Sequence, residues 1–137
     1  MTRYLATALL IFVAGFSRAG EAPLQERPGS SIGYRSVSEA LAALRANPNI
    51  SETDQGGWII LADRTSNTLW SFTPSSHPAH PAAVRREAVE RDGTVYIQMN
   101  VLCQATKEPC DQLVRDFKQL NEQMSQAIKQ ESSGHTP

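Results

Sequence analysis

Residues 94–103 read Thr-Val-Tyr-Ile-Gln-Met-Asn-Val-Leu-Cys, and this stretch decides the fold class. Its side chains alternate with a period of two, which is the period of a β-strand. The odd positions form one predicted face and are Val95, Ile97, Met99, Val101 and Cys103. Asp92-Gly93 comes directly before the strand and is a strong signal for a two-residue hairpin turn. We therefore expect the strand to pair antiparallel with the segment before it.

Three further strands are predicted upstream of this one. The pattern of residues 83–91 is mixed, with Val84 and Ala88 on one face, which is compatible with a strand that carries a β-bulge. Residues 58–62 form a short apolar run, and residues 68–73 alternate, so these two segments are predicted to form a hairpin. Three prolines in residues 74–81 exclude both a helix and a central strand, and this segment is predicted to be a loop.

A helix is predicted at each end of this set of strands. Ser36-Val37-Ser38-Glu39 fits a capping box, and the apolar spacing that follows predicts a helix over residues 37–46, which Pro48 ends. Pro109 suits the first turn of a second helix, and apolar residues recur at spacings of three and four as far as about Lys129.

The order helix, four strands, helix predicts an α+β two-layer sandwich (α-β-β-β-β-α). The sheet is expected to be antiparallel and four-stranded, with both helices on the face that carries Val95 and Ile97. The single domain is expected to span residues 34–130. A flexible segment over residues 20–33 would precede it, and a disordered polar tail over residues 131–137 would follow.

The start of the chain has the pattern of a secretory signal peptide. A basic beginning, an apolar core over residues 8–16 and the small residues of Ser17-Arg18-Ala19 follow in that order, which predicts residues 1–19 as the signal peptide. A membrane-spanning helix needs about 20 apolar residues, and this run is shorter. We therefore expect a periplasmic or secreted protein without stable membrane insertion after cleavage.

Composition and charge exclude several classes of protein. The chain of 137 residues is 40% hydrophobic and 20% charged, which argues against a disordered chain, a collagen-like repeat or a multi-pass membrane protein. Cleavage after Ala19 would remove two arginines and change the formal net charge from −1 to −3. A mildly acidic chain without a basic stripe is a poor partner for nucleic acid.

Cys103 and Cys110 are the two cysteines, and both lie in the predicted mature chain. An even number of cysteines in an exported protein favours a disulfide, which would tie the last strand to the last helix. A redox-active pair and half of a metal site are the alternatives. Redox pairs usually have the spacing Cys-x-x-Cys, whereas six residues separate these two.

The segment His77-Pro78-Ala79-His80 is the most conspicuous candidate site. Two imidazoles three residues apart can reach one metal ion if further ligands arrive, although zinc normally takes three or four protein ligands. The alternative is a rigid loop with two surface histidines. No metal or other cofactor is predicted.

Two other groups of side chains are considered as sites. Trp70 and Phe72 are either core residues or an exposed aromatic platform beside the histidine loop. The arginines and glutamates of residues 85–91 are interpreted as a solvated strand edge with mixed charges. The candidate binding residues are Trp70, Phe72, His77, His80, Arg85 and Arg86. No catalytic residue is predicted, because no nucleophile–base arrangement is recognisable.

The sequence shows one resemblance. Trp70-Ser71-Phe72-Thr73-Pro74, followed by His77-Pro78-Ala79-His80-Pro81 and Val84-Arg85-Arg86, is similar to small exported proteins of Gram-negative bacteria that have no assigned function. The similarity spans about residues 33–126. It implies a periplasmic or secreted protein and transfers no catalytic residue.

Two hypotheses for the function follow. The first is a non-enzymatic exported binding or accessory protein, whose partner is another protein or a component of the cell envelope. This partner would dock on the sheet or on the loop over residues 70–84. The second is a metal-handling protein or a small hydrolase that uses His77 and His80.

Overall fold

The structure is a computed structural model that describes residues 32–134. The predicted signal peptide, most of the segment over residues 20–33 and the last three residues of the predicted tail lie outside the described residues. The elements are α1 (Val37–Arg45), β1 (Ile50–Gln55), β2 (Trp58–Asp63), β3 (Thr68–Phe72), β4 (Ala82–Arg91), β5 (Thr94–Cys103) and α2 (Lys107–Ser133).

The five strands form one open antiparallel sheet in which each strand pairs with its neighbour in the chain, in the order β1-β2-β3-β4-β5. The α+β class, the hairpin of β2 with β3 and the hairpin of β4 with β5 confirm the predictions. The number of strands was predicted wrongly, because β1 was missed. Five of its six residues are exposed, so it lacks the apolar alternation that marks a half-buried strand.

The turn between β1 and β2 could have revealed the missing strand. Gly56 and Gly57 both have positive φ angles, of 63° and 86°, and they connect the directly paired residues Gln55 and Trp58. Gly-Gly is one of the dipeptides that favour two-residue hairpin turns. The Gly-Gly turn therefore indicated a β1–β2 hairpin, although the side chains of β1 did not indicate a strand.

The strand β4 is regular and lies inside the sheet. Ten consecutive residues of β4 pair with ten of β5, from Ala82 opposite Cys103 to Arg91 opposite Thr94, and the register has no bulge. Since β3 lies on its other side, β4 is also not a strand edge. Both sequence-based interpretations of residues 83–91, the bulge and the solvated edge, are therefore corrected.

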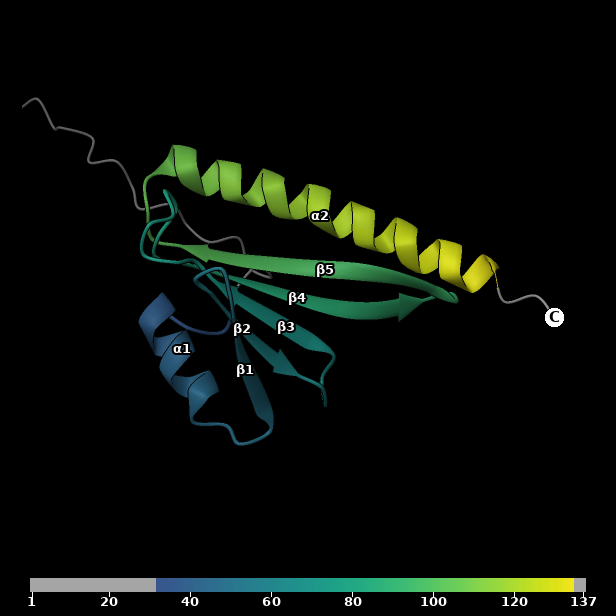
Figure 1. Ribbon diagram of the computed structural model, residues 1–137, viewed down its shortest axis with the longest axis horizontal. Coiled ribbons are helices and arrows are strands. Elements are labelled where there is room, and N and C mark those ends of the chain that lie inside the picture. The colour runs from purple at the N-terminus through teal and green to yellow at the C-terminus, as the bar shows by residue number, and fades with distance from the viewer. Residues whose placement is uncertain (1–31, 135–137) are drawn as a thin grey trace, which may run out of the picture.

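The two helices lie on opposite faces of the sheet (Figure 1). The residues of α1 pack with Leu61, Trp70 and Phe72, whereas the residues of α2 pack with Val84 and with Met99, Val101 and Cys103 of β5. The expectation that both helices share one face is corrected. The physical reason is that the sheet has two apolar faces, and each must be covered.

The helix α1 begins where the capping box was predicted. The Oγ of Ser36 accepts a hydrogen bond from the backbone N–H of Glu39 at 3.1 Å. The carboxylate of Glu39 reaches one residue further back than the motif predicts and accepts from the N–H of Arg35 at 3.0 Å. The Ser36 side chain satisfies a backbone donor that the first turn leaves without a partner, and the Glu39 carboxylate ties the residue before the cap to the helix.

The helix α2 is held at its start by the predicted disulfide. The Cys103–Cys110 bond joins the last residue of β5 to the first turn of α2, and the two Cα atoms are 5.8 Å apart. From there α2 runs back along β5 (Figure 1). It ends at Ser133, four residues beyond the expected end, so the predicted tail begins too early at residue 131.

Candidate functional site

Trp70 and Phe72 are core residues. Their side chains are 5% and 2% exposed, and their rings stack at a centroid distance of 6.5 Å. Tyr34 packs edge-on against Trp70 from the segment before α1, at 5.8 Å. Neither ring is available to a partner at the surface, so the exposed aromatic platform is not formed.

The loop between β3 and β4 uses both of its histidines in local contacts. The His77 ring packs edge-on against Trp58 at 5.1 Å, and its Nδ1 accepts a hydrogen bond from the N–H of Ala79. The Nδ1 of His80 lies 3.0 Å from the carbonyl oxygen of Thr73. Within residues 32–134, no group of three or more histidine, cysteine, aspartate or glutamate side chains is arranged to hold a metal ion.

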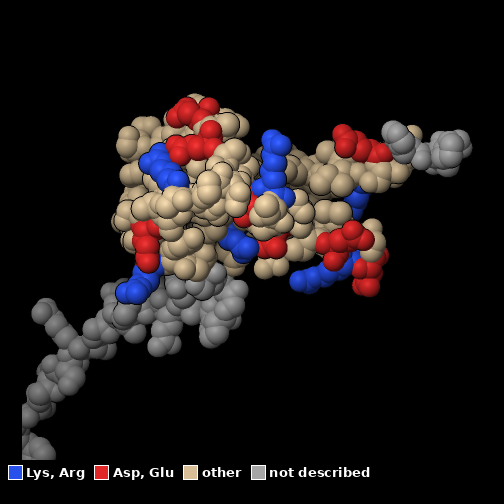
Figure 2. All heavy atoms as spheres, turned by 90° about the horizontal axis from the view of Figure 1, so that it is seen from below, with Lys and Arg blue, Asp and Glu red and all other residues tan. Residues whose placement is uncertain are grey.

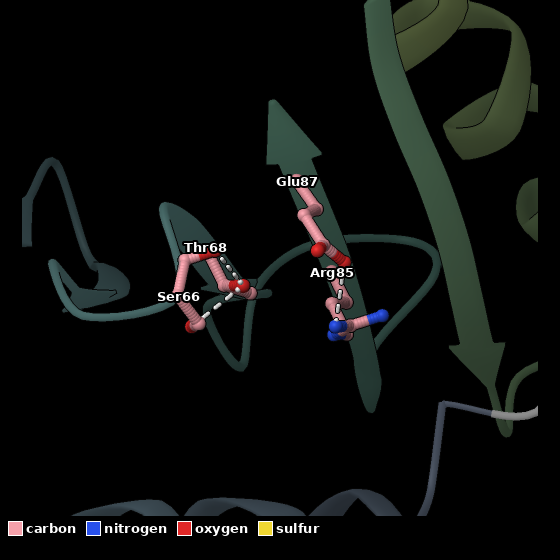
Figure 3. A network of polar contacts seen from close by, with 4 residues as sticks. All are labelled: Ser66, Thr68, Arg85 and Glu87. Carbon is pink, nitrogen blue, oxygen red and sulfur yellow. Dashed lines mark hydrogen bonds and ion pairs between the residues drawn. The ribbon is translucent and has the colours of Figure 1, made fainter. Parts of the chain in front are cut away.

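The neighbouring arginines of β4 point to opposite faces of the sheet. Arg85 lies on the α1 side, where its guanidinium is 5.9 Å from the centroid of the Trp70 ring and forms an ion pair of 2.7 Å with Glu87 (Figure 3). Arg85 is therefore a paired cation at the margin of the core.

Arg86 lies on the α2 side and is buried without an acidic partner. It is 8% exposed, and no carboxylate within residues 32–134 forms an ion pair with it. Its Nη2 donates to Ser71 Oγ at 3.4 Å, its Nη1 contacts the sulfur of Met124 at 3.6 Å, and its Nε has no partner. Burial lowers the pKa of the guanidinium, because it disfavours the charged form.

An arginine with five N–H donors needs more than two long contacts when it leaves water. The ring of Phe117 supplies part of the compensation, since the guanidinium lies 5.1 Å from its centroid. The positive charge itself is not neutralised by any described side chain. Arg86 is therefore suited to receive an anionic group.

A hollow opens beside Arg86 and provides room for such a group. It has a volume of about 310 Å³ and lies between α2 and the part of the sheet that α2 leaves uncovered. Its walls are Gln55, Trp58, Ile60, Ser71, Arg86, Asp116, Phe117 and Leu120. We call this hollow the Arg86 cleft. A smaller hollow of about 110 Å³, which also touches Leu69 and Met124, adjoins Arg86.

The position of the cleft follows from the uneven cover of the two faces. The helix α2 packs chiefly on β5, at one edge of the sheet, so the α2-side face of β2 and β3 is open. Trp58 and Ile60 lie on this open face and remain partly buried, and Leu120 of α2 is 40% exposed beside them. The walls of the cleft are therefore largely apolar, with one cation, Arg86, and one carboxylate, Asp116.

Sequence reasoning found Arg86 but not its surroundings. Val84 and Ala88 were assigned to one face of the strand. Because side chains alternate along a strand, this assignment also places Arg86 on that apolar face, so its burial could have been predicted. Phe117 and Leu120, both in α2, lie more than thirty residues from Arg86 in the sequence. Their approach to β4 depends on the tertiary structure.

The charges on the surface are mixed. On the face shown in Figure 2, basic and acidic side chains alternate and form no field of one sign. Among the described residues, no helix has the length and apolar character needed to cross a membrane.

Comparison of the chain with protein-family models, with curated proteins and with solved structures gives no match.

Proposed function

We propose that the chain is a non-enzymatic binding protein that holds a small amphipathic carboxylate in the Arg86 cleft. The observation that carries the proposal is the guanidinium of Arg86, which is buried and has no acidic partner among the described residues. A planar carboxylate matches the fork of N–H donors on a guanidinium, and such charged hydrogen bonds are among the strongest in proteins.

The walls of the cleft favour an apolar body on the ligand. Trp58, Ile60 and Leu120 would contact an alkyl or aryl group, while Gln55 and Ser71 offer a few polar contacts. Apolar lining with a small number of polar groups is typical of small-molecule sites, and 310 Å³ lies at the lower end of their range of about 300–1,000 Å³.

The charge of the cleft favours a single carboxylate over a phosphate dianion. Arg86 is the one cation among the lining residues, and Asp116 adds a negative charge at the margin. Arg86 can pair with the one charge of a carboxylate, whereas the second charge of a dianion would have no cation and would be repelled by Asp116. A fatty acid of medium length has the required single charge and an apolar body.

Decanoate, titrated below the concentration at which it aggregates, tests the proposal by calorimetry. We expect decanoate to bind and the uncharged 1-decanol to bind at least about tenfold more weakly, because a hydrogen bond to a charged group contributes about 1.5–3 kcal/mol. Arg86→Met should remove this preference for the acid. Arg91→Met is the matched control, since Arg91 is an exposed arginine of the same strand. Equal binding of the acid and the alcohol would contradict the proposal.

We also propose that the protein is exported. The Cys103–Cys110 disulfide supports this location, because such bonds persist in oxidising compartments. The mass of the protein from its native host should correspond to a chain that begins at Gly20 and contains one disulfide. A mass that includes residues 1–19 together with two free thiols would contradict export.

A further inference from the structure

The two edge strands of the sheet differ in length and charge. β1 has six residues and includes Glu52 and Asp54, whereas β5 has ten residues and no charged side chain. Proteins commonly keep sheet edges from pairing with other chains by making them short or charged. β1 has both forms of protection, and β5 has neither.

Every second residue of β5 directs its backbone polar groups away from β4. Arg91 and Thr94 close the two-residue turn, and such a closing pair exchanges both of its hydrogen bonds. Hydrogen-bonded pairs alternate along an antiparallel ladder, so the odd residues from Val95 to Val101 point their N–H and C=O groups outward. Within residues 32–134, no strand pairs with this edge.

Another hollow lies along this edge, between β5 and α2. It has a volume of about 350 Å³ and is lined by Tyr96, Ile97, Met99, Lys118, Asn121, Glu122 and Ser125. Tyr96 is 51% exposed here. Asn121 is 8% exposed, and its Oδ1 is buried without a hydrogen-bond partner in the described part of the chain. The edge therefore combines open backbone groups, exposed apolar surface and an amide oxygen without a hydrogen-bond partner among the described residues, while the Nδ2 of Asn121 donates to Met99 Sδ at 3.4 Å.

We propose that this edge is the interface of a homodimer, in which two copies of the chain pair antiparallel through β5. The two sheets become one sheet of ten strands, and the α2 helices of the two copies lie side by side. A twofold axis passes near the middle of β5, close to Gln98 and Met99. The proposal is independent of the ligand, because the Arg86 cleft lies on the other side of α2.

The charges on α2 favour a second copy of the chain as the partner. Lys118 and Glu122 are exposed, both line the hollow, and neither forms an ion pair within residues 32–134. They are four residues apart, about one helical turn. The axis that makes the β5 strands antiparallel also makes the α2 helices antiparallel. Lys118 of one copy then faces Glu122 of the other, and the reverse pair forms by symmetry.

Sedimentation velocity of the purified protein tests the interface. We expect a species with twice the mass of the chain at micromolar concentration. Lys118→Glu or Glu122→Lys alone turns both symmetry-related 118–122 pairs into pairs of like charge. Either single variant should therefore weaken the dimer about tenfold. The combined variant restores opposite charges and should recover the dimer. Glu131→Lys is the matched control, because Glu131 is exposed, lies outside this hollow and is about half a turn of the helix around from Glu122, and it should leave the mass unchanged.

A backbone variant tests the strand pairing itself. Ile97→Pro removes an outward N–H that β4 does not use, and should give a monomer whose circular dichroism is that of the unsubstituted chain. If this variant does not fold, the charge series decides alone. A monomer at about 100 μM, or a dimer that responds equally to Glu131→Lys and to Lys118→Glu, would overturn the proposal.

Discussion

The guanidinium of Arg86 lies 5.1 Å from the centroid of the Phe117 ring, so a cation of the interior strand β4 is covered by an aromatic residue of α2. Phe117 also contacts Trp58, at a centroid distance of 5.8 Å. The three side chains connect β2, β4 and α2 at the wall of the cleft. Any change in the position of α2 therefore changes the surroundings of Arg86.

Arg86→Met should leave the free energy of unfolding unchanged or raise it by about 1–3 kcal/mol. Methionine keeps most of the apolar volume and removes a buried charge that has no acidic partner among the described residues, and such replacements are often stabilising. Urea denaturation measures the change. A loss of more than about 2 kcal/mol would mean that the contacts with Phe117 and Ser71 outweigh the cost of burying the charge.

Leu113→Ala should lower the free energy of unfolding by about 2–5 kcal/mol. The Leu113 side chain lies on the buried face of α2, is 2% exposed, and leaves a cavity when it is removed. Leu120→Ala is the matched control on the same helix. Leu120 is 40% exposed, so its truncation should cost less than about 1 kcal/mol. Thermal unfolding followed by circular dichroism compares the two variants, and similar losses would argue against the observed orientation of α2.

Replacing both Cys103 and Cys110 with alanine should lower the free energy of unfolding by about 2.5 kcal/mol. The bond closes a short loop, with a sequence separation of 7, and chain-entropy estimates for loops of this length give that value. Guanidinium titrations of the variant and of the oxidised protein give the difference. Reduction of the unsubstituted protein should reproduce it, and an unchanged midpoint in both experiments would contradict the prediction.

The stability of the protein should depend on Asp63 at low pH. Hydrogen bonds from the Thr65 side chain, and then from that of Ser66, hold the pKa of the Asp63 carboxyl below its usual value. The carboxylate therefore stabilises the fold above about pH 4, and this contribution is lost as the pH falls through the lowered value. Asp63→Asn should reduce the melting temperature at pH 6. The difference from the unsubstituted protein should shrink towards pH 2, and a difference that is constant with pH would contradict this account.

Trp58→Phe leaves Trp70 as the single tryptophan, and its fluorescence should be blue-shifted and poorly quenched by acrylamide. Trp70 is 5% exposed between Tyr34 and Phe72, so the quencher has little access to it. The converse variant Trp70→Phe should leave Trp58, which is less buried, more readily quenched. Strong quenching of Trp70 would instead indicate an exposed aromatic platform.

Local patterns predicted most elements because their causes are local. The capping box at Ser36 and the Asp92-Gly93 turn depend on hydrogen bonds and φ angles within a few residues. The strand β1 was missed for a physical reason as well, since it is an exposed edge strand. It is held by backbone pairing with β2, which depends little on the identity of its side chains.

The candidate residues divided according to the face on which they lie. Trp70 and Arg85 point to the α1 side, where they are a core residue and a paired cation, whereas Arg86 points to the α2 side and lines the cleft. Alternation along β4 predicts that the two arginines point apart. That alternation does not predict which face of the sheet each helix covers.

The sequence by itself determined the helices, four of the strands and the cysteine pair, because side-chain periodicity, caps, tight turns and loop length act over short distances along the chain. The tertiary structure alone decided that α1 and α2 take opposite faces, that β4 lies inside the sheet, and that Arg86 meets Phe117 beside an open cleft. These outcomes depend on how two apolar faces are shared between a helix of nine residues and one of twenty-seven. That division is settled by packing between segments far apart in the sequence.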